Sequence, residues 1–187
     1  MTIDKKRRLR TWLFIPPVLA ALIALDQWVK YLAFVNLKGK PSLPVLGDFL
    51  QVYYTTNNGA AWGIMKNNRW IFMVITAIIL VFMVILVVHG VYAKYKLWNI
   101  GATLVLAGGL GNMIDRVGWG FEADKKVIDL FYIKIIDFPV FNVADIMVVT
   151  GAITLAILFL FIHKTEDDIK ETPTEIDYAA DQTDCSP

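Results

Sequence analysis

Residues Trp70 to Val88 read WIFMVITAIILVFMVILVV, and this stretch decides the class of protein. Its 19 residues include no charged side chain. An α-helix needs about 20 predominantly apolar residues to cross the ~30 Å hydrocarbon core of a bilayer. Backbone N–H and C=O groups find no water partners in lipid, so a segment that crosses it must be helical. The stretch therefore predicts a transmembrane helix.

Three further segments have the same apolar character: about Trp12–Phe34, Leu97–Ile114 and Ile146–Ile162. Hydrophobic residues make up 57% of the 187 residues, and charged residues make up 19%. Soluble domains usually contain about a quarter charged residues. The composition and the four segments together predict an all-α membrane protein with four transmembrane helices.

The composition also excludes several kinds of site and partner. The formal net charge of +1 is unlike the strongly basic balance of a nucleic-acid binder, so we expect no nucleic-acid partner. The single cysteine, Cys185, excludes an intramolecular disulfide and a zinc cluster of the cysteine type. The two histidines, His89 and His163, lie at the ends of apolar runs. We therefore expect no metal site and no cofactor.

The chain divides into a basic N-terminal tail (residues 1–11), a membrane domain (12–163) and an acidic C-terminal tail (164–187) that is expected to be disordered. Basic residues near the ends of membrane helices mark the cytoplasmic side. Five of them lie within the ten residues before the first helix, so both termini are expected in the cytoplasm. Nothing in the sequence requires more than a monomer.

This orientation leaves two long loops, residues 36–69 and 117–141, on the outer side. Each contains a run rich in β-branched and aromatic residues, Leu50–Thr56 in the first and Val127–Ile133 in the second. Such runs are typical of strands. We therefore expect four transmembrane helices with a small β-containing outer subdomain, a sheet that rests on the outer leaflet.

Polar residues gather at the outer ends of the predicted helices, where they are costly and thus candidates for function. Asn112 and Asp115 end the third helix, and Asn142 and Asp145 begin the fourth, each pair spaced as Asn-x-x-Asp. Residues three apart share a helix face. Because one helix runs outward and the next returns, we expect Asp115 and Asp145 to meet as a dyad of carboxylates.

Two close carboxylates can hydrolyse a peptide bond, because repulsion between like charges separates their pKa values into an acid and a base. Asp145 lies near a helix N-terminus, which favours its ionised form, and is the expected base. Asp115 lies near a helix C-terminus, which favours its neutral form, and is the expected acid.

Each candidate also has a purely structural interpretation. Asp145 could cap its helix. Asp115 could form an interfacial ion pair with Arg116. Asp26 and Lys30, four residues apart, could form a pair within their helix that lowers the cost of burying both.

Two other functions remain open for a polar cluster in a membrane protein. An ion or proton carrier would use Asp26, Asp115 and Asp145 as titrating groups, but the apolar cytoplasmic halves of the last three helices offer no polar path. A non-catalytic scaffold predicts that replacing Asp115 or Asp145 by Asn is silent. Asp129 and Asp137, in the second outer loop, are interpreted as structural or solvated.

Four short motifs, taken in order, resemble the bacterial lipoprotein signal peptidases, also called signal peptidase II. The resemblance covers about residues 10–163. The motifs are Asp26-Gln27-Trp28-Val29-Lys30, Asn57-Asn58-Gly59-Ala60-Ala61-Trp62-Gly63, Gly111-Asn112-Met113-Ile114-Asp115-Arg116 and Phe141-Asn142-Val143-Ala144-Asp145.

The resemblance implies an intramembrane aspartyl endopeptidase of the bacterial cytoplasmic (inner) membrane, with its active site near the outer face. Its substrates would be diacylglyceryl-modified prolipoproteins, cut just before the lipidated cysteine. The resemblance carries the catalytic pair onto Asp115 and Asp145 and implies no metal. Supporting or substrate-facing roles carry over to Asp26, Lys30, Asn57, Gly59, Ala61, Asn112, Arg116 and Asn142.

The sequence departs from the family pattern in three places. The family often has Phe where Trp62 stands. The stretch Lys126–Phe131 replaces one that is commonly Gly-x-Val-Val-Asp-Phe-like, and a longer charged piece precedes it. The acidic tail is extra. These departures bear on the substrate-facing loops rather than on the chemistry.

Overall fold

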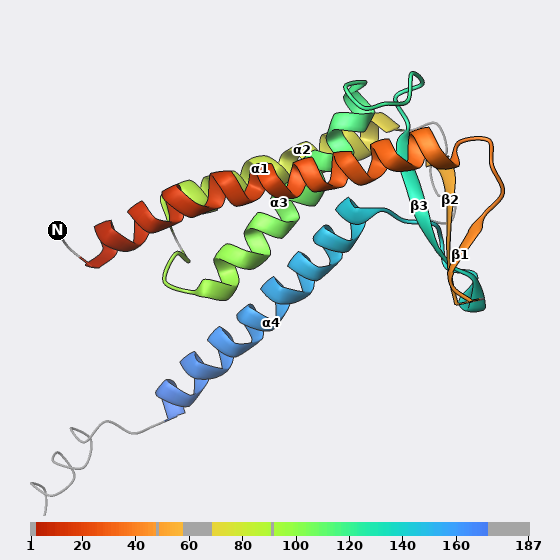
Figure 1. Cartoon of the computed structure of the whole chain (residues 1–187). Coiled ribbons are helices and arrows are strands. Elements are labelled where there is room, and N and C mark those ends of the chain that lie inside the picture. Colours follow the sequence, from red (N-terminus) through yellow and green to blue (C-terminus); the bar gives the residue numbers. More distant parts are fainter. Residues whose placement is uncertain (1–2, 48, 58–68, 91, 172–187) are drawn as a thin grey trace, which may run out of the picture.

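The computed structural model describes residues 3–47, 49–57, 69–90 and 92–171 of the chain. Within them lie four long helices (Figure 1): α1 (Ile3–Leu37), α2 (Arg69–His89), α3 (Lys96–Val117) and α4 (Val143–Glu171). Each contains a segment that is long and apolar enough to cross a membrane. The prediction of four transmembrane helices is confirmed.

Two of the helices extend beyond the expected limits. α1 already begins at Ile3, inside the expected N-terminal tail, and α4 continues to Glu171, inside the expected acidic tail. Residues 164–171 are therefore helical where disorder was expected. Residues 172–187 lie outside the described part.

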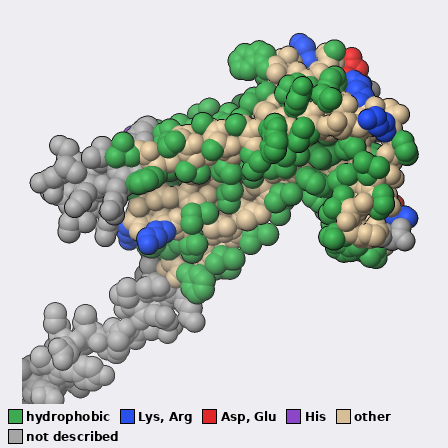
Figure 2. Space-filling view, in the orientation of Figure 1, with side chains coloured by type: hydrophobic (Ala, Val, Ile, Leu, Met, Phe, Trp, Pro, Cys, Tyr) green, Lys and Arg blue, Asp and Glu red, His purple; other side chains and the backbone are tan. Residues whose placement is uncertain are grey.

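Hydrophobic side chains cover most of the helical surface, and charged side chains gather toward its two ends (Figure 2). This distribution matches a bundle whose middle faces lipid. α3 lies at the centre of the bundle: its apolar window is 56% buried, against 17% or less in the other three helices. It packs against α1, α2 and α4.

Glycines bring α3 and α4 close together. A Cβ atom at Gly108 would lie 2.2 Å from the carbonyl oxygen of Ala144, and one at Gly151 would lie 2.7 Å from that of Gly101. Close approach through small residues is a common way for membrane helices to pack. The position of α4 against α3, and of the residues that begin α4, thus depends on these glycines.

Replacing Gly108 by Ala should destabilise the protein by about 1–3 kcal/mol, because the added methyl group meets backbone on α4 that cannot move aside easily. Thermal unfolding in detergent would measure the loss. The neighbouring Gly109→Ala variant is the matched control, since its Cβ would meet only the side chain of Leu80. Equal melting temperatures for the two variants would contradict the prediction.

Three antiparallel strands form one sheet beyond the C-terminal end of α1, in the order β1 (Leu43–Leu46), β2 (Leu50–Asn57), β3 (Val127–Ile133). The strand predictions in both outer loops are confirmed. The third strand, β1, was not predicted, because it is a four-residue edge strand that includes Pro44.

The sheet packs against the C-terminal end of α1. Ile128 and Leu130 of β3 are buried in a cluster with Ala33 and Leu37 of α1. Successive side chains of a strand point to opposite faces. Asp129, between Ile128 and Leu130, is therefore directed away from α1.

The connection from α3 to β3 is also tied to its surroundings. Glu122 accepts hydrogen bonds from the Tyr54 hydroxyl on β2 and, at 2.9 Å, from Lys38 Nζ. These bonds, that from Tyr54 foremost, lower the pKa of Glu122. After β3, the single turn η2 (Lys134–Ile136) leads back to α4.

Candidate active site

A buried lysine joins α1 to α3. Lys30 Nζ lies 2.9 Å from Asp26 Oδ2 and 2.8 Å from Asp115 Oδ2, and it donates a hydrogen bond of 3.0 Å to Asn112 Oδ1. The side chains of Lys30 and Asp26 are fully buried, and that of Asp115 is 1% exposed. Charges removed from water in this way are stable only when they are paired and hydrogen-bonded.

The same cluster reaches α4. The other carboxylate oxygen of Asp26 accepts a hydrogen bond of 2.9 Å from the backbone N–H of Ala144, in the first turn of α4. Gln27 Nε2 donates to Asp115 Oδ1 at 3.3 Å and to the Gly111 carbonyl at 3.1 Å. Asp26 and Asp115 thus link α1, α3 and α4 at the N-terminal end of α4.

Replacing Lys30 by Met should lower the free energy of unfolding by about 3–5 kcal/mol, because it leaves buried carboxylates without their cation. Lys38→Met is the matched control. Lys38 is 46% exposed and pairs with Glu122, and an exposed pair of this kind contributes about 0–1 kcal/mol. Chemical unfolding in micelles would compare them, and a similar small loss in both would refute a structural role for Lys30.

A second polar group begins at the N-terminus of α4. Asn142 and Asp145 cap the helix reciprocally: the Asp145 N–H donates to Asn142 Oδ1 at 3.0 Å, and the Asn142 N–H donates to Asp145 Oδ2 at 3.1 Å. This is the arrangement of a capping box. Asn112 Nδ2 donates to the remaining oxygen, Asp145 Oδ1, at 2.8 Å. The expected capping role of Asp145 is confirmed, and it leaves room for a second role.

Asp129 on β3 belongs to this second group. Its Oδ1 accepts a hydrogen bond of 2.7 Å from Asn142 Nδ2, and its Oδ2 accepts one of 3.1 Å from Asn57 Nδ2. The residue is 2% exposed. Burial, and after it the nearby charge of Asp145, raise the pKa of Asp129 to about 7. The proton can therefore stay on this carboxyl group near neutral pH.

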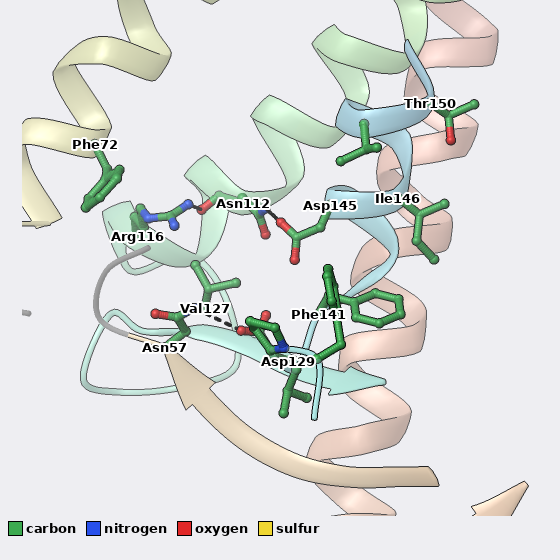
Figure 3. Close-up of a pocket in the computed structure, with 14 residues that line it drawn as sticks. Asn57, Phe72, Asn112, Arg116, Val127, Asp129, Phe141, Asp145, Ile146 and Thr150 are labelled. Carbon is green, nitrogen blue, oxygen red and sulfur yellow. Dashed lines mark hydrogen bonds between the residues drawn. The ribbon is translucent and has the colours of Figure 1, made fainter. Parts of the chain in front are cut away.

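Asp129 and Asp145 border the same cavity, which has a volume of about 470 Å³. Figure 3 shows Asp145 on α4 and Asp129 on β3 beside this space, with Asn112 and Arg116 of α3 at its edge. The Arg116 guanidinium donates to the Asn112 carbonyl at 3.2 Å. Most of the other walls are apolar: Phe72, Val127, residues 138–141, Ile146 and Val149.

Asp115 has a different neighbour from the one expected. Its carboxylate pairs with Lys30, and it is not among the residues that line the cavity. The path from Asp115 to Asp145 runs through Lys30 and Asn112. The structure therefore places Asp115 against the buried cation of α1 and Asp145 at the cavity, and the catalytic pairing of Asp115 with Asp145 stays a prediction.

Most of the other predicted site residues lie in two neighbouring groups. Asp26, Lys30 and Asn112 lie in the buried cluster, and Asn57, Arg116, Asn142 and Asp145 surround or support the cavity. Gly59 and Ala61 lie outside the described residues, as does Trp62. The catalytic roles of the predicted residues stay predictions.

Asp129 is the site residue that the sequence analysis missed. The sequence analysis interpreted Asp129 as structural or solvated. The second alternative is wrong, because the Asp129 side chain is buried. One signal was present: Asp129 is the only charged residue in the strand Val127-Ile128-Asp129-Leu130-Phe131, and a lone acid in an apolar strand is rarely buried without a specific role. Asp137, by contrast, is exposed and accepts a hydrogen bond from the Tyr132 hydroxyl.

The chain matches the family described as signal peptidase (SPase) II over residues 18–161. It belongs to the signal peptidase II family. The resemblance seen in the four motifs is thereby confirmed, and the chain is a protease of the signal peptidase II type.

Relatives and solved structures agree. A protein named lipoprotein signal peptidase from Geobacillus thermodenitrificans (strain NG80-2) is 38% identical over 146 residues, 77% of this chain and 84% of the relative. One of the same name from Clostridioides difficile (strain 630) is 37% identical over 151 residues, 78% of this chain and 94% of the relative. A solved structure described as a bacterial membrane enzyme superposes with a TM-score of 0.72 at 31% identity, covering 86% and 93% of the two chains.

No group of three or more His, Cys, Asp or Glu side chains among the described residues is arranged to hold a metal ion. The polar side chains that border the cavity carry carboxylates, amides, one guanidinium and the hydroxyl group of Thr150. Such a set can move protons and donate hydrogen bonds to a peptide.

The raised pKa of Asp129 should make stability depend on pH. An unfolded Asp loses its proton near pH ~3.9, whereas folded Asp129 keeps it up to about pH 7. The contribution of this group is therefore complete below about pH 4 and is lost progressively as the pH rises to about 7. Melting temperatures should fall between about pH 4 and about pH 7 more steeply in the wild type than in Asp129→Asn. Parallel curves would show that Asp129 titrates normally.

Proposed function

We propose that this chain removes signal peptides from prolipoproteins as an aspartic endopeptidase, and that Asp129 and Asp145 are its two catalytic carboxylates. The substrate class follows from the signal peptidase II family and from the relatives named lipoprotein signal peptidase. The motif resemblance adds that the substrate carries a diacylglyceryl group and is cut just before the cysteine that bears it.

The observation that carries the choice of residues is that Asp129 and Asp145 border one cavity and share Asn142 as a hydrogen-bond donor. Asn142 donates to Asp129 through its side chain and to Asp145 through its backbone. The two carboxylates are thus held near each other by a residue that is itself fully buried. A water molecule or a scissile carbonyl group in the cavity would meet both.

The surroundings of the two carboxylates give them different roles. Asp145 receives hydrogen bonds from Asn112 and from the backbone at the N-terminus of α4, and such donors stabilise a negative charge. Asp145 is therefore the general base that takes a proton from water. Asp129, with its pKa raised to about 7, keeps a proton and polarises the carbonyl oxygen.

The reaction then follows from this division. Water, as it loses a proton to Asp145, attacks the carbonyl carbon, while Asp129 donates its proton to the oxygen. The tetrahedral intermediate collapses when the C–N bond breaks: the leaving nitrogen takes the proton held by Asp145, and one hydroxyl group of the intermediate gives its proton to Asp129 as the new C=O bond forms. Asp145 is then ionised and Asp129 protonated, as at the start.

Asp115, in this proposal, is a positioning residue. It neutralises Lys30, and Lys30 holds the Asn112 side chain that donates to Asp145. Its effect on activity is transmitted through Asn112. The earlier expectation, in which Asp115 is the acid itself, is the alternative that mutagenesis must separate.

The cavity is accessible to a substrate anchored in lipid. Phe72 of α2 and Ile146, Val149 and Thr150 of α4 form part of its wall, and they belong to segments apolar enough to cross the membrane. With both termini in the cytoplasm, as the basic N-terminal residues favour, the site lies near the outer face of the cytoplasmic membrane. A lipidated cysteine anchored in the outer leaflet would reach it there.

Cleavage of a diacylglyceryl-modified prolipoprotein in detergent micelles tests the proposal. Asp129→Asn and Asp145→Asn should each lower kcat by about 10²–10⁴-fold, the usual contribution of an acid or base. Their melting temperatures at acidic pH should stay near that of the wild type. Because the two groups act as a unit, the double variant should be hardly slower than either single variant.

Asp115→Asn is the variant that separates the two assignments. We expect it to lower the melting temperature and to retain measurable turnover under conditions where it is folded. If folded Asp115→Asn is as inactive as Asp145→Asn while Asp129→Asn still cuts, the catalytic pair is Asp115 and Asp145. If the wild type cuts no prolipoprotein, the proposed function itself is wrong.

A further inference from the structure

A second cavity, of about 250 Å³, lies between α2, α3 and α4. Its walls are mostly aliphatic: Ile79 and Leu80 come from α2, Val105 from α3, and Val148 and Val149 from α4. All of these residues belong to segments apolar enough to cross the membrane. The cavity therefore lies at the depth of the lipid chains. We call it the α2–α4 slot.

The slot continues the catalytic cavity toward the membrane interior. Asn112, Arg116 and Asp145 line both cavities. Along α3 the slot extends from Arg116 to Val105, a difference of 11 positions, which corresponds to about 16 Å at 1.5 Å per residue. Its outer end is thus polar and adjoins the reacting groups, and the remainder is apolar.

The slot is open to lipid on one side and narrow on the other. Ile79 is 47% exposed and Val149 is 57% exposed, so the edges of α2 and α4 leave an opening toward the bilayer. At the back, Leu80 is buried and lies against α3, where a Cβ atom on Gly109 would come within 2.8 Å of Leu80 Cδ2. The space between these limits suits a thin, flexible, apolar group.

We propose that the α2–α4 slot binds one acyl chain of the diacylglyceryl group carried by the substrate cysteine. This inference rests on the proposed function. The length of the slot, about 16 Å, is close to half the ~30 Å thickness of the hydrocarbon core, which is the depth that one lipid chain spans. The polar end places Arg116 where its N–H groups can donate to the ester oxygens, next to the peptide bond to be cut.

The other apolar part of such a substrate, the membrane-spanning segment of the signal peptide, fits the slot poorly. In lipid this segment must be helical. A helix with its side chains is ~10–12 Å wide, so a single turn fills roughly 400–600 Å³. The slot offers about 250 Å³. The acyl chain therefore enters the slot, and the signal-peptide helix must pack elsewhere.

Two adjacent residues of α2 provide a matched test. Ile79 lines the slot, whereas Ile78 is 64% exposed and does not line it. Ile79→Trp and Ile78→Trp would be compared on prolipoprotein peptides of one sequence that carry two octanoyl, dodecanoyl or hexadecanoyl chains. Thr76→Phe, which enlarges a second slot residue on the same helix, is the reserve variant if Ile79→Trp does not fold.

In Ile79→Trp, the KM relative to wild type should rise with chain length, to about tenfold for the hexadecanoyl substrate, as expected when a few buried methylenes no longer fit. Ile78→Trp should match the wild type at every chain length. A KM increase in Ile79→Trp that is the same for all chain lengths would overturn the slot proposal while leaving the proposed function intact. A wild type that cuts none of the three substrates would overturn the proposed function and the slot with it.

Discussion

The ammonium group of Lys30 determines how α1, α3 and the start of α4 are arranged. It is fully buried and contacts Asp26 on its own helix and Asp115 and Asn112 on α3. Through Asp26 it is coupled to the first turn of α4, and through Asn112 it is coupled to Asp145. Removing a partner from a charge buried in this way is strongly destabilising. The relative positions of α1, α3 and α4, and so of the cavity between α4 and the sheet, follow from this one group.

Four buried or partly buried acids therefore divide into two pairs with different tasks. Asp26 and Asp115 neutralise the cation and hold the helices. Asp129 and Asp145 border the cavity, and amide groups of asparagines, rather than cations, hold them. This separation keeps Lys30 from neutralising the pair that carries out the chemistry in our proposal. It also explains how so many acids can lie close together without repelling the helices apart.

The sequence was sufficient for the parts of the fold that depend on local pattern. Apolar length predicted the four helices, and the β-branched run at Val127–Ile133 predicted β3 with the bounds that the structure shows. The sequence pattern of β1, a short edge strand that contains Pro44, is too weak to predict a strand. The Asn-x-x-Asp spacing placed Asp145 at the site. The spacing of residues within α3 contains no information about Lys30, which lies 85 positions before Asp115 and forms an ion pair with its carboxylate. Asp129 lies against Asn57 of β2 and Asn142 at the start of α4, and no local pattern records these contacts between distant segments.

The protonation of Asp129 tests most directly whether it is the partner of Asp145. Infrared spectroscopy of the protein in micelles would follow the carbonyl band of protonated carboxyl groups across neutral pH. The pKa of about 7 for Asp129 predicts a band that disappears as the pH rises through that value. The band should be absent from Asp129→Asn and present in Asp115→Asn, with the same midpoint. A band that persists in Asp129→Asn and is lost in Asp115→Asn would contradict the account, because the protonated carboxyl group would then be that of Asp115.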